Sequence, residues 1–302
     1  MKSVILYLLF FIICYAEPIT PIPQNLEVDE KKVSLGKLLF FDTILSVDNT
    51  ISCASCHDLE NGGDDGLKFS FGIEGREGSI NSPTVYNAVF NFRQFWNGRA
   101  KNLFDQIEGP IVNPNEMGNS FKNIVNTLNK TPYKNMFLKI YKDGVTKKNI
   151  KDVIVEYEKT LITPNSPFDQ YLRGDKSAIT QDQKDGYLLF KNKGCISCHH
   201  GINVGGNLYN KFGIMQYVRS DSLGKFEITK REEDKYYFKV PSLRNVEKTA
   251  PYLHDGRFET LEEVVKFMAR YQLGQVVTQE EIDKIVFFLK SLSGEIPQSA
   301  KR

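Results

Sequence analysis

Apolar side chains recur at helical spacing along most of the chain, and segments with strand-like alternation are few and short. Four segments begin with a threonine that can cap a helix, and in three of them a Gln or Glu follows three residues later, as in a capping box. These predicted helices begin after Thr146, Thr180, Thr260 and Thr278. Gly294 is expected to end the last one. The pattern predicts a mainly α-helical protein with few short strands.

A short sequence occurs twice and indicates an internal duplication. Gly-Lys-Leu-Leu-Phe spans residues 36–40, and Gly-Tyr-Leu-Leu-Phe spans residues 186–190. Each copy precedes a Cys-x-x-Cys-His segment, at residues 53–57 and 195–199. We therefore expect two cytochrome c-like domains packed together, each built around its own haem.

The Cys-x-x-Cys-His segments are typical of covalent c-type haem attachment. Each thiol adds to a haem vinyl group, and the histidine that follows reaches the iron. A single Cys-x-x-Cys could also be a redox dithiol or half of a zinc site. Two copies, each followed by histidine, favour two covalently bound c-type haems. The predicted attachment and ligand residues are Cys53, Cys56 and His57 for the first haem and Cys195, Cys198 and His199 for the second.

The ends of the chain suggest export and a division into two domains. Residues 1–16 combine Lys2 with an apolar run and small residues, which is typical of a secretory signal peptide and too short for a membrane anchor. We expect residues 17–165 to form the N-terminal domain and residues 166–302 the C-terminal domain, with the last residues packing on the N-terminal one. C-type haem is attached outside the cytoplasm, so the predicted location is the periplasm.

Charge and ligand counts restrict the chemistry further. The 39 basic and 37 acidic residues nearly balance, and no basic block suited to nucleic acid is present. No histidine lies between residues 58 and 198, so the first haem lacks a second imidazole in its own domain. One haem would then be open to a ligand, which suggests an enzyme.

The second ligand of the C-terminal haem has several candidates. His200 is expected at the surface, and His254 could ligate iron or contact it indirectly. Apart from Met1, the methionines are Met117, Met136, Met215 and Met268. Met268 is the best candidate because it lies on a predicted amphipathic helix that could close over the haem, although methionines at helical spacing more often belong to a core.

From about Leu35 to Gly294 the chain resembles bacterial dihaem cytochrome c peroxidases. The matching segments are Leu35-Gly-Lys-Leu-Leu-Phe-Phe-Asp42, Ser52-Cys-Ala-Ser-Cys-His57, Asn81-Ser-Pro-Thr84, Phe95-Trp-Asn-Gly-Arg99, Asn113-Pro-Asn-Glu-Met117, Pro241-Ser-Leu-Arg-Asn245 and Ala250-Pro-Tyr-Leu-His-Asp-Gly256.

The resemblance implies roles at these positions. The N-terminal haem would react with peroxide, and the C-terminal haem, ligated by His199 and Met268, would store an electron. Glu116 would be the distal acid–base residue, Gln106 its partner, and Trp96 the residue between the haems. One calcium ion would be held by Asn81 and the carbonyls of Thr249 and Pro251.

One position departs from the family pattern. Many members carry a histidine in the loop before the Asn-x-Pro-Thr segment, which blocks the peroxide haem until the other haem is reduced. Here that loop is Phe71-Gly-Ile-Glu-Gly-Arg-Glu-Gly78, and Ile73 occupies the histidine position. The reductive switch therefore lacks its imidazole.

The resulting hypothesis is a periplasmic dihaem peroxidase. It would reduce hydrogen peroxide with electrons from a small monohaem cytochrome c, and a homodimer is expected from the resemblance. Two alternatives are a dihaem enzyme that oxidises a protein substrate and a dihaem electron-transfer protein without catalytic activity. The relatives that oxidise proteins use tyrosine at the position of Met268, which counts against the first alternative.

Overall fold

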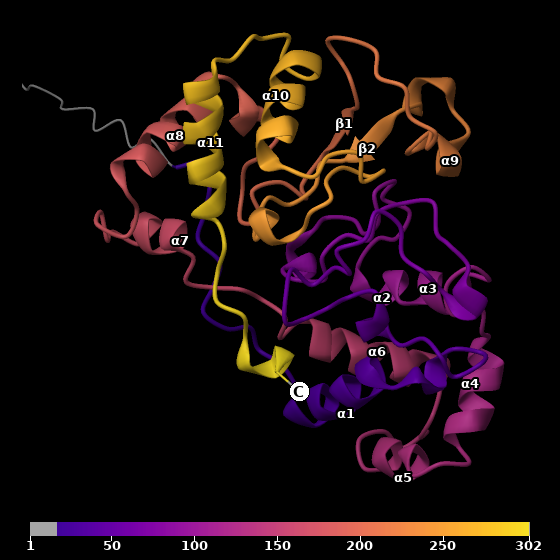
Figure 1. Ribbon diagram of the computed structural model, residues 1–302. Coiled ribbons are helices and arrows are strands. Elements are labelled where there is room, and N and C mark those ends of the chain that lie inside the picture. Colours follow the sequence, from indigo (N-terminus) through magenta and orange to yellow (C-terminus); the bar gives the residue numbers. More distant parts are fainter. Residues whose placement is uncertain (1–16, 302) are drawn as a thin grey trace, which may run out of the picture.

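The computed structural model describes residues 17–301, and the predicted signal peptide lies outside them. The fold is mainly helical, as predicted, and its two halves lie one above the other in Figure 1. The lower half contains α1 (Glu30–Phe41), α2 (Leu103–Gln106), α3 (Glu108–Val112), α4 (Phe121–Leu128), α5 (Tyr133–Leu138) and α6 (Lys147–Glu158). Its 3₁₀ helices are η1 (Thr43–Leu45), η2 (Cys53–Ser55), η3 (Ile73–Gly75) and η4 (Ala88–Phe90).

The upper half contains the remaining elements. Its helices are α7 (Pro167–Leu172), α8 (Gln181–Asn192), α9 (Phe226–Thr229), α10 (Leu261–Tyr271) and α11 (Gln279–Lys290). Its 3₁₀ turns are η5 (Cys195–Ser197), η6 (Glu232–Asp234) and η7 (Val246–Lys248), while η8 (Gln298–Ala300) lies near the chain end. Strands β1 (Tyr209–Lys211) and β2 (Tyr237–Lys239) form a small antiparallel sheet. None of the helices in residues 17–301 is long and apolar enough to cross a bilayer.

The duplicated sequence marks a close helix crossing in each half. A Cβ atom at Gly36 on α1 would lie 1.9 Å from the Val153 carbonyl oxygen on α6. A Cβ atom at Gly186 on α8 would lie 1.9 Å from the Lys284 carbonyl oxygen on α11. Any side chain would force the helices apart, so glycine is required at both crossings.

Helix starts were predicted more accurately than the last helix end. Thr146, Thr180, Thr260 and Thr278 are all N-caps, and the last three form capping boxes. The prediction that Gly294 ends α11 is wrong, because the helix stops at Lys290. Glycine has another use there: a Cβ would lie 2.0 Å from the Thr163 carbonyl oxygen.

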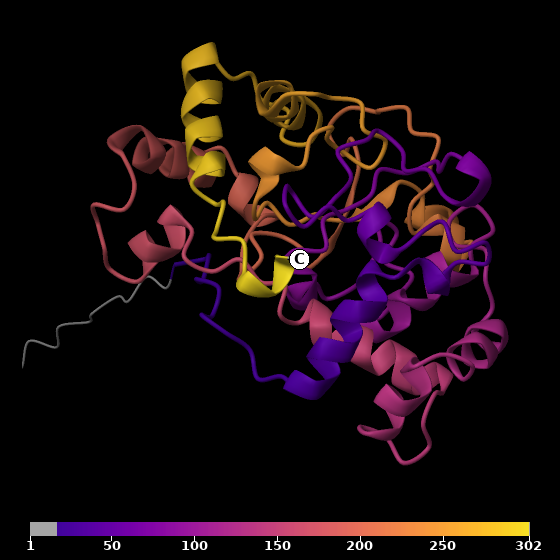
Figure 2. The same ribbon diagram turned by 60° about the horizontal axis from the view of Figure 1, so that its bottom comes forward.

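Each end of the described chain packs on the opposite half. Ile19 is buried in the core formed by α7, α8 and α11, and the Gly201 amide donates to the Pro18 carbonyl at 2.7 Å. Ala300 is buried against α1 and α6, where the Tyr157 hydroxyl donates to the Ser299 carbonyl at 3.2 Å. Figures 1 and 2 show the C-terminus beside α1, far from α11. The two ends therefore tie the halves together.

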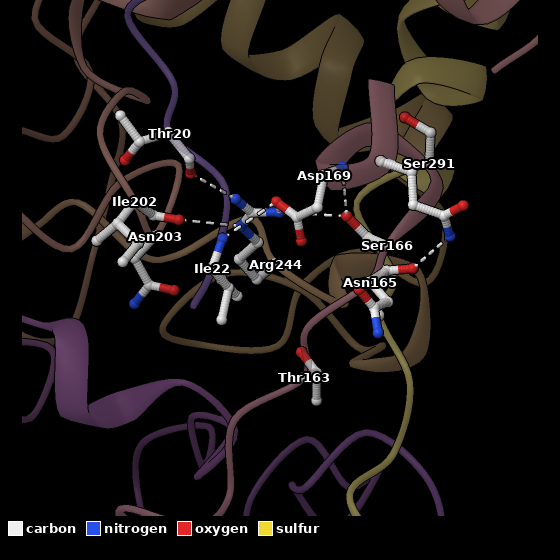
Figure 3. Close-up of polar contacts among 12 residues, drawn as sticks. Thr20, Ile22, Thr163, Asn165, Ser166, Asp169, Ile202, Asn203, Arg244 and Ser291 are labelled. Atoms are coloured by element: carbon white, nitrogen blue, oxygen red, sulfur yellow. Dashed lines mark hydrogen bonds and ion pairs between the residues drawn. The ribbon is translucent and has the colours of Figure 1, made fainter. Parts of the chain in front are cut away.

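A buried ion pair fixes the N-terminal segment to the upper half (Figure 3). The Arg244 and Asp169 side chains are fully buried, with Nη1 and Oδ1 2.8 Å apart. Arg244 also donates to the Thr20 and Ile202 carbonyls, each at 3.0 Å. The Asp169 carboxylate accepts the Ile22 amide at 3.3 Å. A buried charge needs these partners, because it has lost its hydration.

We expect Arg244→Met to destabilise the folded state by about 3–5 kcal/mol, since Asp169 would remain as a buried carboxylate without its cation. The denaturant midpoint of the haem-loaded protein should fall. Arg231→Met is the matched control, because Arg231 is 57% exposed and its partner Asp234 keeps a second cation, Lys225, at 2.9 Å; its midpoint should hardly move. Equal midpoints for the two variants would show that the buried pair does not hold the N-terminal segment in place.

Candidate functional site

A cavity of about 470 Å³ in the upper half contains the second haem motif. Cys195, Cys198 and His199 line one part of it, and Met268 on α10 also lines it. Among the described residues both cysteines are free of disulfides. The cavity therefore brings together the two thiols and both iron ligands predicted for this haem.

The His199 ring is oriented for metal binding. Its Nδ1 lies 3.3 Å from the Val204 carbonyl oxygen, which can only accept, so Nδ1 carries the proton. Burial lowers the pKa of His199 to about 4, and the ring is neutral at pH 7. A neutral ring with Nδ1 protonated leaves the Nε2 lone pair available for iron.

The methionines differ clearly in their surroundings. Met117 is buried in the helical core of the lower half, and Met136 is on α5. Met215 and Met268 both line the cavity, but Met215 is 61% exposed at its edge. Met268 is partly buried and packs against the cluster that contains Leu253 and Phe267, so it is the more enclosed of the two methionines that line the cavity.

The first haem motif repeats this arrangement in the lower half. His57 Nδ1 lies 3.0 Å from the Gly63 carbonyl oxygen, and burial lowers the pKa of the ring. Phe40 of the first repeat lies 6.5 Å from His57, and Phe190 of the second lies 6.4 Å from His199, measured between ring centroids. Each repeat thus supports the histidine of its own motif. Burial also raises the pKa of the Cys53 and Cys56 thiols.

Glu116 lies in the loop after α3, near the first haem motif. Its Oε1 accepts a hydrogen bond from Asn113 Nδ2 at 2.6 Å. Burial raises the pKa of the carboxyl group, while that hydrogen bond and the charge of Arg99 oppose the rise. The Glu116 charge in turn contributes to the raised pKa of Cys56, so the carboxyl group lies near the first haem motif. A carboxyl group with a raised pKa is suited to exchange a proton near neutral pH.

The loop that contains Ile73 packs against the Glu116 segment. Ile73 is buried, and its amide donates to the Glu116 carbonyl at 2.8 Å. Gly72 has no room for a side chain, since a Cβ would lie 2.1 Å from the Asn115 carbonyl oxygen. Gln106, the predicted partner of Glu116, is half-buried at the end of α2. Its side-chain amide makes no hydrogen bond within the described residues, so the structure does not join it to Glu116.

The segment that contains Phe95, Trp96 and Arg99 lies near both haem motifs. The Arg99 guanidinium lies 3.3 Å from the centroid of the Phe95 ring and acts electrostatically on Glu116. Trp96, in the same segment, lines the cavity of the second motif. Its indole Nε1 donates to the Asn81 carbonyl at 2.9 Å. Trp96 thus lies at the junction of the two halves, and its position between two haems stays a prediction.

The predicted calcium ligands border one cavity at this junction. Asn81, Thr249 and Pro251 all line the same cavity. The Asn81 amide nitrogen donates to the Leu67 carbonyl at 2.9 Å, which leaves Oδ1 free. Within residues 17–301, neither the Thr249 nor the Pro251 carbonyl accepts a hydrogen bond. Three free oxygen atoms suit a hard cation such as Ca²⁺.

The two remaining histidines have different environments. His254 is buried and stacked on Phe238, with ring centroids 4.2 Å apart, and its Nε2 lies 2.8 Å from the Ser220 hydroxyl. It also lines the cavity, and burial lowers its pKa to about 4. His200 was expected at the surface, but it is half-buried and its Nδ1 accepts from Asn207 Nδ2 at 3.0 Å. His254 therefore belongs to the surroundings of the second motif, whereas His200 does not line the cavity.

Sequence reasoning missed two cations at these sites. Arg99 was noticed only as part of a matching segment, and Lys239 was not singled out. Lys239 is buried and lines the cavity. Its position on a strand of three residues carries no signal in the sequence, because the cavity is formed by segments distant along the chain.

Several known proteins are similar to this chain in sequence or in fold. A family model described as di-haem cytochrome c peroxidase matches residues 30–177. "Cytochrome c peroxidase Ccp" of Escherichia coli is 50% identical over 92% of this chain, which spans 61% of that protein's length. "Cytochrome c551 peroxidase" of Nitrosomonas europaea is 45% identical, with coverage of 93% of this chain and 85% of the relative. A solved MauG-like protein associated with microbial copper homeostasis is 25% identical, with a TM-score of 0.80 over 97% of this chain and 98% of its own.

We propose Met268 as the second ligand of the C-terminal haem and expect Met268→His to lower its reduction potential markedly, because imidazole replaces thioether. Potentiometric titration of the low-spin haem measures this. Met215→His is the control, since Met215 borders the same cavity but is exposed. A Met268→His potential equal to that of the wild type would exclude Met268 as the ligand, and a shift only in Met215→His would point to Met215.

Proposed function

Because the chain belongs to the di-haem cytochrome c peroxidase family, we propose that it reduces hydrogen peroxide to two molecules of water with two electrons from a small c-type cytochrome. Reaction at the N-terminal haem is supported by one observation above all. Glu116, a half-buried carboxyl group with a raised pKa, lies near Cys56 of the first haem motif. The predicted signal peptide supports a periplasmic location for this activity.

Most of these residues bind the two haems, and Trp96 serves electron transfer between them. His57 and His199 hold the irons, and the four motif cysteines attach the haems covalently. Both histidines present a free Nε2. The haem iron supplies the chemistry that cleaves the O–O bond. Met268 gives the C-terminal haem a thioether ligand, which favours its reduced form. Trp96 lies between the halves, where an electron must pass.

Glu116 moves the proton that peroxide cleavage requires. Its carboxylate accepts a proton from the inner peroxide oxygen and returns it to the outer oxygen, which leaves as water. Asn113 holds the carboxylate in place through its 2.6 Å hydrogen bond, and this bond and the charge of Arg99 oppose the rise in the pKa of Glu116. Gln106 is free to donate a hydrogen bond to the bound peroxide.

A calcium ion at the junction completes the proposal. Asn81 comes from the lower half, whereas Thr249 and Pro251 come from the upper half, and all three oxygens lack other partners within the described residues. A cation bound by these atoms would hold the two halves, and the indole of Trp96 between them, in a fixed relation. Trp96 bonds to the Asn81 carbonyl, so the ion and the electron path share a residue.

We expect Glu116→Gln to retain both haems but to lose about 10²–10⁴-fold in peroxidase turnover, since the amide cannot carry the proton. Steady-state turnover with reduced cytochrome c measures this. Wild-type turnover should also fall as the pH drops through the raised pKa of Glu116, because the base form is required, and the variant should lack that fall. Near-normal turnover in Glu116→Gln would assign the proton transfer to another group.

We expect the fully oxidised enzyme to react with peroxide without prior reduction, because Ile73 cannot ligate the peroxide haem. Its oxidised spectrum should contain a high-spin haem that binds cyanide. Ile73→His should introduce a low-spin resting state and a lag before turnover, whereas Ile73→Leu, which changes only packing, should not. Electron paramagnetic resonance and pre-steady-state assays of the oxidised and half-reduced enzyme measure this. Two low-spin signals without cyanide binding in the wild type would contradict the prediction.

A further inference from the structure

The described chain buries three cationic side chains, and only one of them lacks an acidic partner. Arg244 is paired with Asp169 at 2.8 Å, and Lys151 lies 3.5 Å from a carboxylate oxygen of Glu108. Lys239 is 6% exposed and forms no ion pair or side-chain hydrogen bond within residues 17–301. Burial of an unpaired ammonium group costs several kcal/mol, so its position needs an explanation.

Lys239 lies at the junction of the two halves. It is the last residue of β2, where it pairs with Tyr209 on β1. Its amide donates to the Trp96 carbonyl at 2.8 Å, and Trp96 in turn bonds to Asn81. Lys239 also lines the cavity that His199 and Met268 line. This buried lysine therefore borders the space that a haem would fill.

The electrostatics of Lys239 indicate which kind of group would complete the site. Burial alone lowers the pKa of Lys239 to about 8, and no carboxylate among the described residues counteracts it. An anion in the cavity would restore the charge and offset the lost hydration. A haem carries two carboxylates on its propionate groups, and these have to be accommodated when the ring is buried.

From this geometry we propose that Lys239 is the cationic partner of a propionate carboxylate of the C-terminal haem and that its charge raises the reduction potential of that haem. The inference rests on the haem site of the proposed function. A fixed positive charge near the ring disfavours the ferric state, which carries one more positive charge than the ferrous state. The pair also links β2 and Trp96 to the haem edge.

The test compares potentials of the low-spin haem in four haem-loaded proteins. Lys239→Met should lower the potential by an amount that corresponds to at least a tenfold change in the reduction equilibrium, or about 59 mV for one electron. Lys239→Arg should retain most of the wild-type potential, because it keeps the charge. Lys211→Met is the matched control, since it removes the same charge from exposed Lys211 on the neighbouring strand.

Two results would overturn the proposal. One is a Lys239→Met potential no lower than that of Lys211→Met, and the other is an equal fall in Lys239→Arg and Lys239→Met. If Lys239→Met does not load haem, Lys239→Gln keeps a polar group of similar length and should still show the fall. Infrared redox-difference spectra of wild-type protein with ¹³C-labelled haem carboxylates add a measurement without mutation. The labelled groups should remain ionised at pH 7, and a protonated carboxyl band there would also overturn the proposal.

Peroxidase turnover is measured separately on the same samples. A wild-type protein that does not reduce peroxide would refute the proposed function but would leave the potential shift of Lys239→Met interpretable. An unchanged potential in an active Lys239→Met enzyme would refute the role of Lys239 alone. The two proposals can therefore fail independently.

Discussion

The architecture depends on two helix crossings at which backbones almost touch. At Gly36 and at Gly186 the space for a Cβ atom is occupied by a carbonyl of the opposite helix. Because no side chain separates the helices, the phenylalanine one turn further along each of α1 and α8 is brought close to the histidine of its haem motif. The same pentapeptide thus builds the same support twice, and the different chemistry of the two halves arises from the segments that cover each site.

Local patterns allowed much of this to be predicted. Threonine caps located the starts of α6, α8, α10 and α11, and the helical class, the family and the enzyme class of a cytochrome-c peroxidase are confirmed. The haem motifs were readable because attachment requires a fixed local spacing. Gly294 was misread because a glycine that permits close backbone contact looks the same in sequence as one that ends a helix.

Interactions between residues that lie far apart in the sequence could not be predicted in the same way. The influence of Arg99 on Glu116 and the unpaired burial of Lys239 arise only when distant segments fold together. Charge composition gives no hint of them, since acidic and basic residues nearly balance along the chain. The predicted amphipathic helix favoured Met268 over the other methionines as the iron ligand. The choice between Met268 and Met215 also required the exposure of each side chain, which only the structure gives. A single sequence therefore identifies groups that act within one motif better than groups that act across a cavity.

The packing of each chain end on the opposite half has a consequence for the order in which the fold forms. Because the chain is synthesised from its N-terminus, Cys53 emerges long before residues 298–301. The packing of Ala300 and Ser299 on α1 and α6 can form only after these last residues have been synthesised. The N-terminal arm, conversely, must wait for Asp169 and Arg244 before it finds its place. The contacts that join each end of the chain to the opposite half thus form only after both haem motifs have been synthesised.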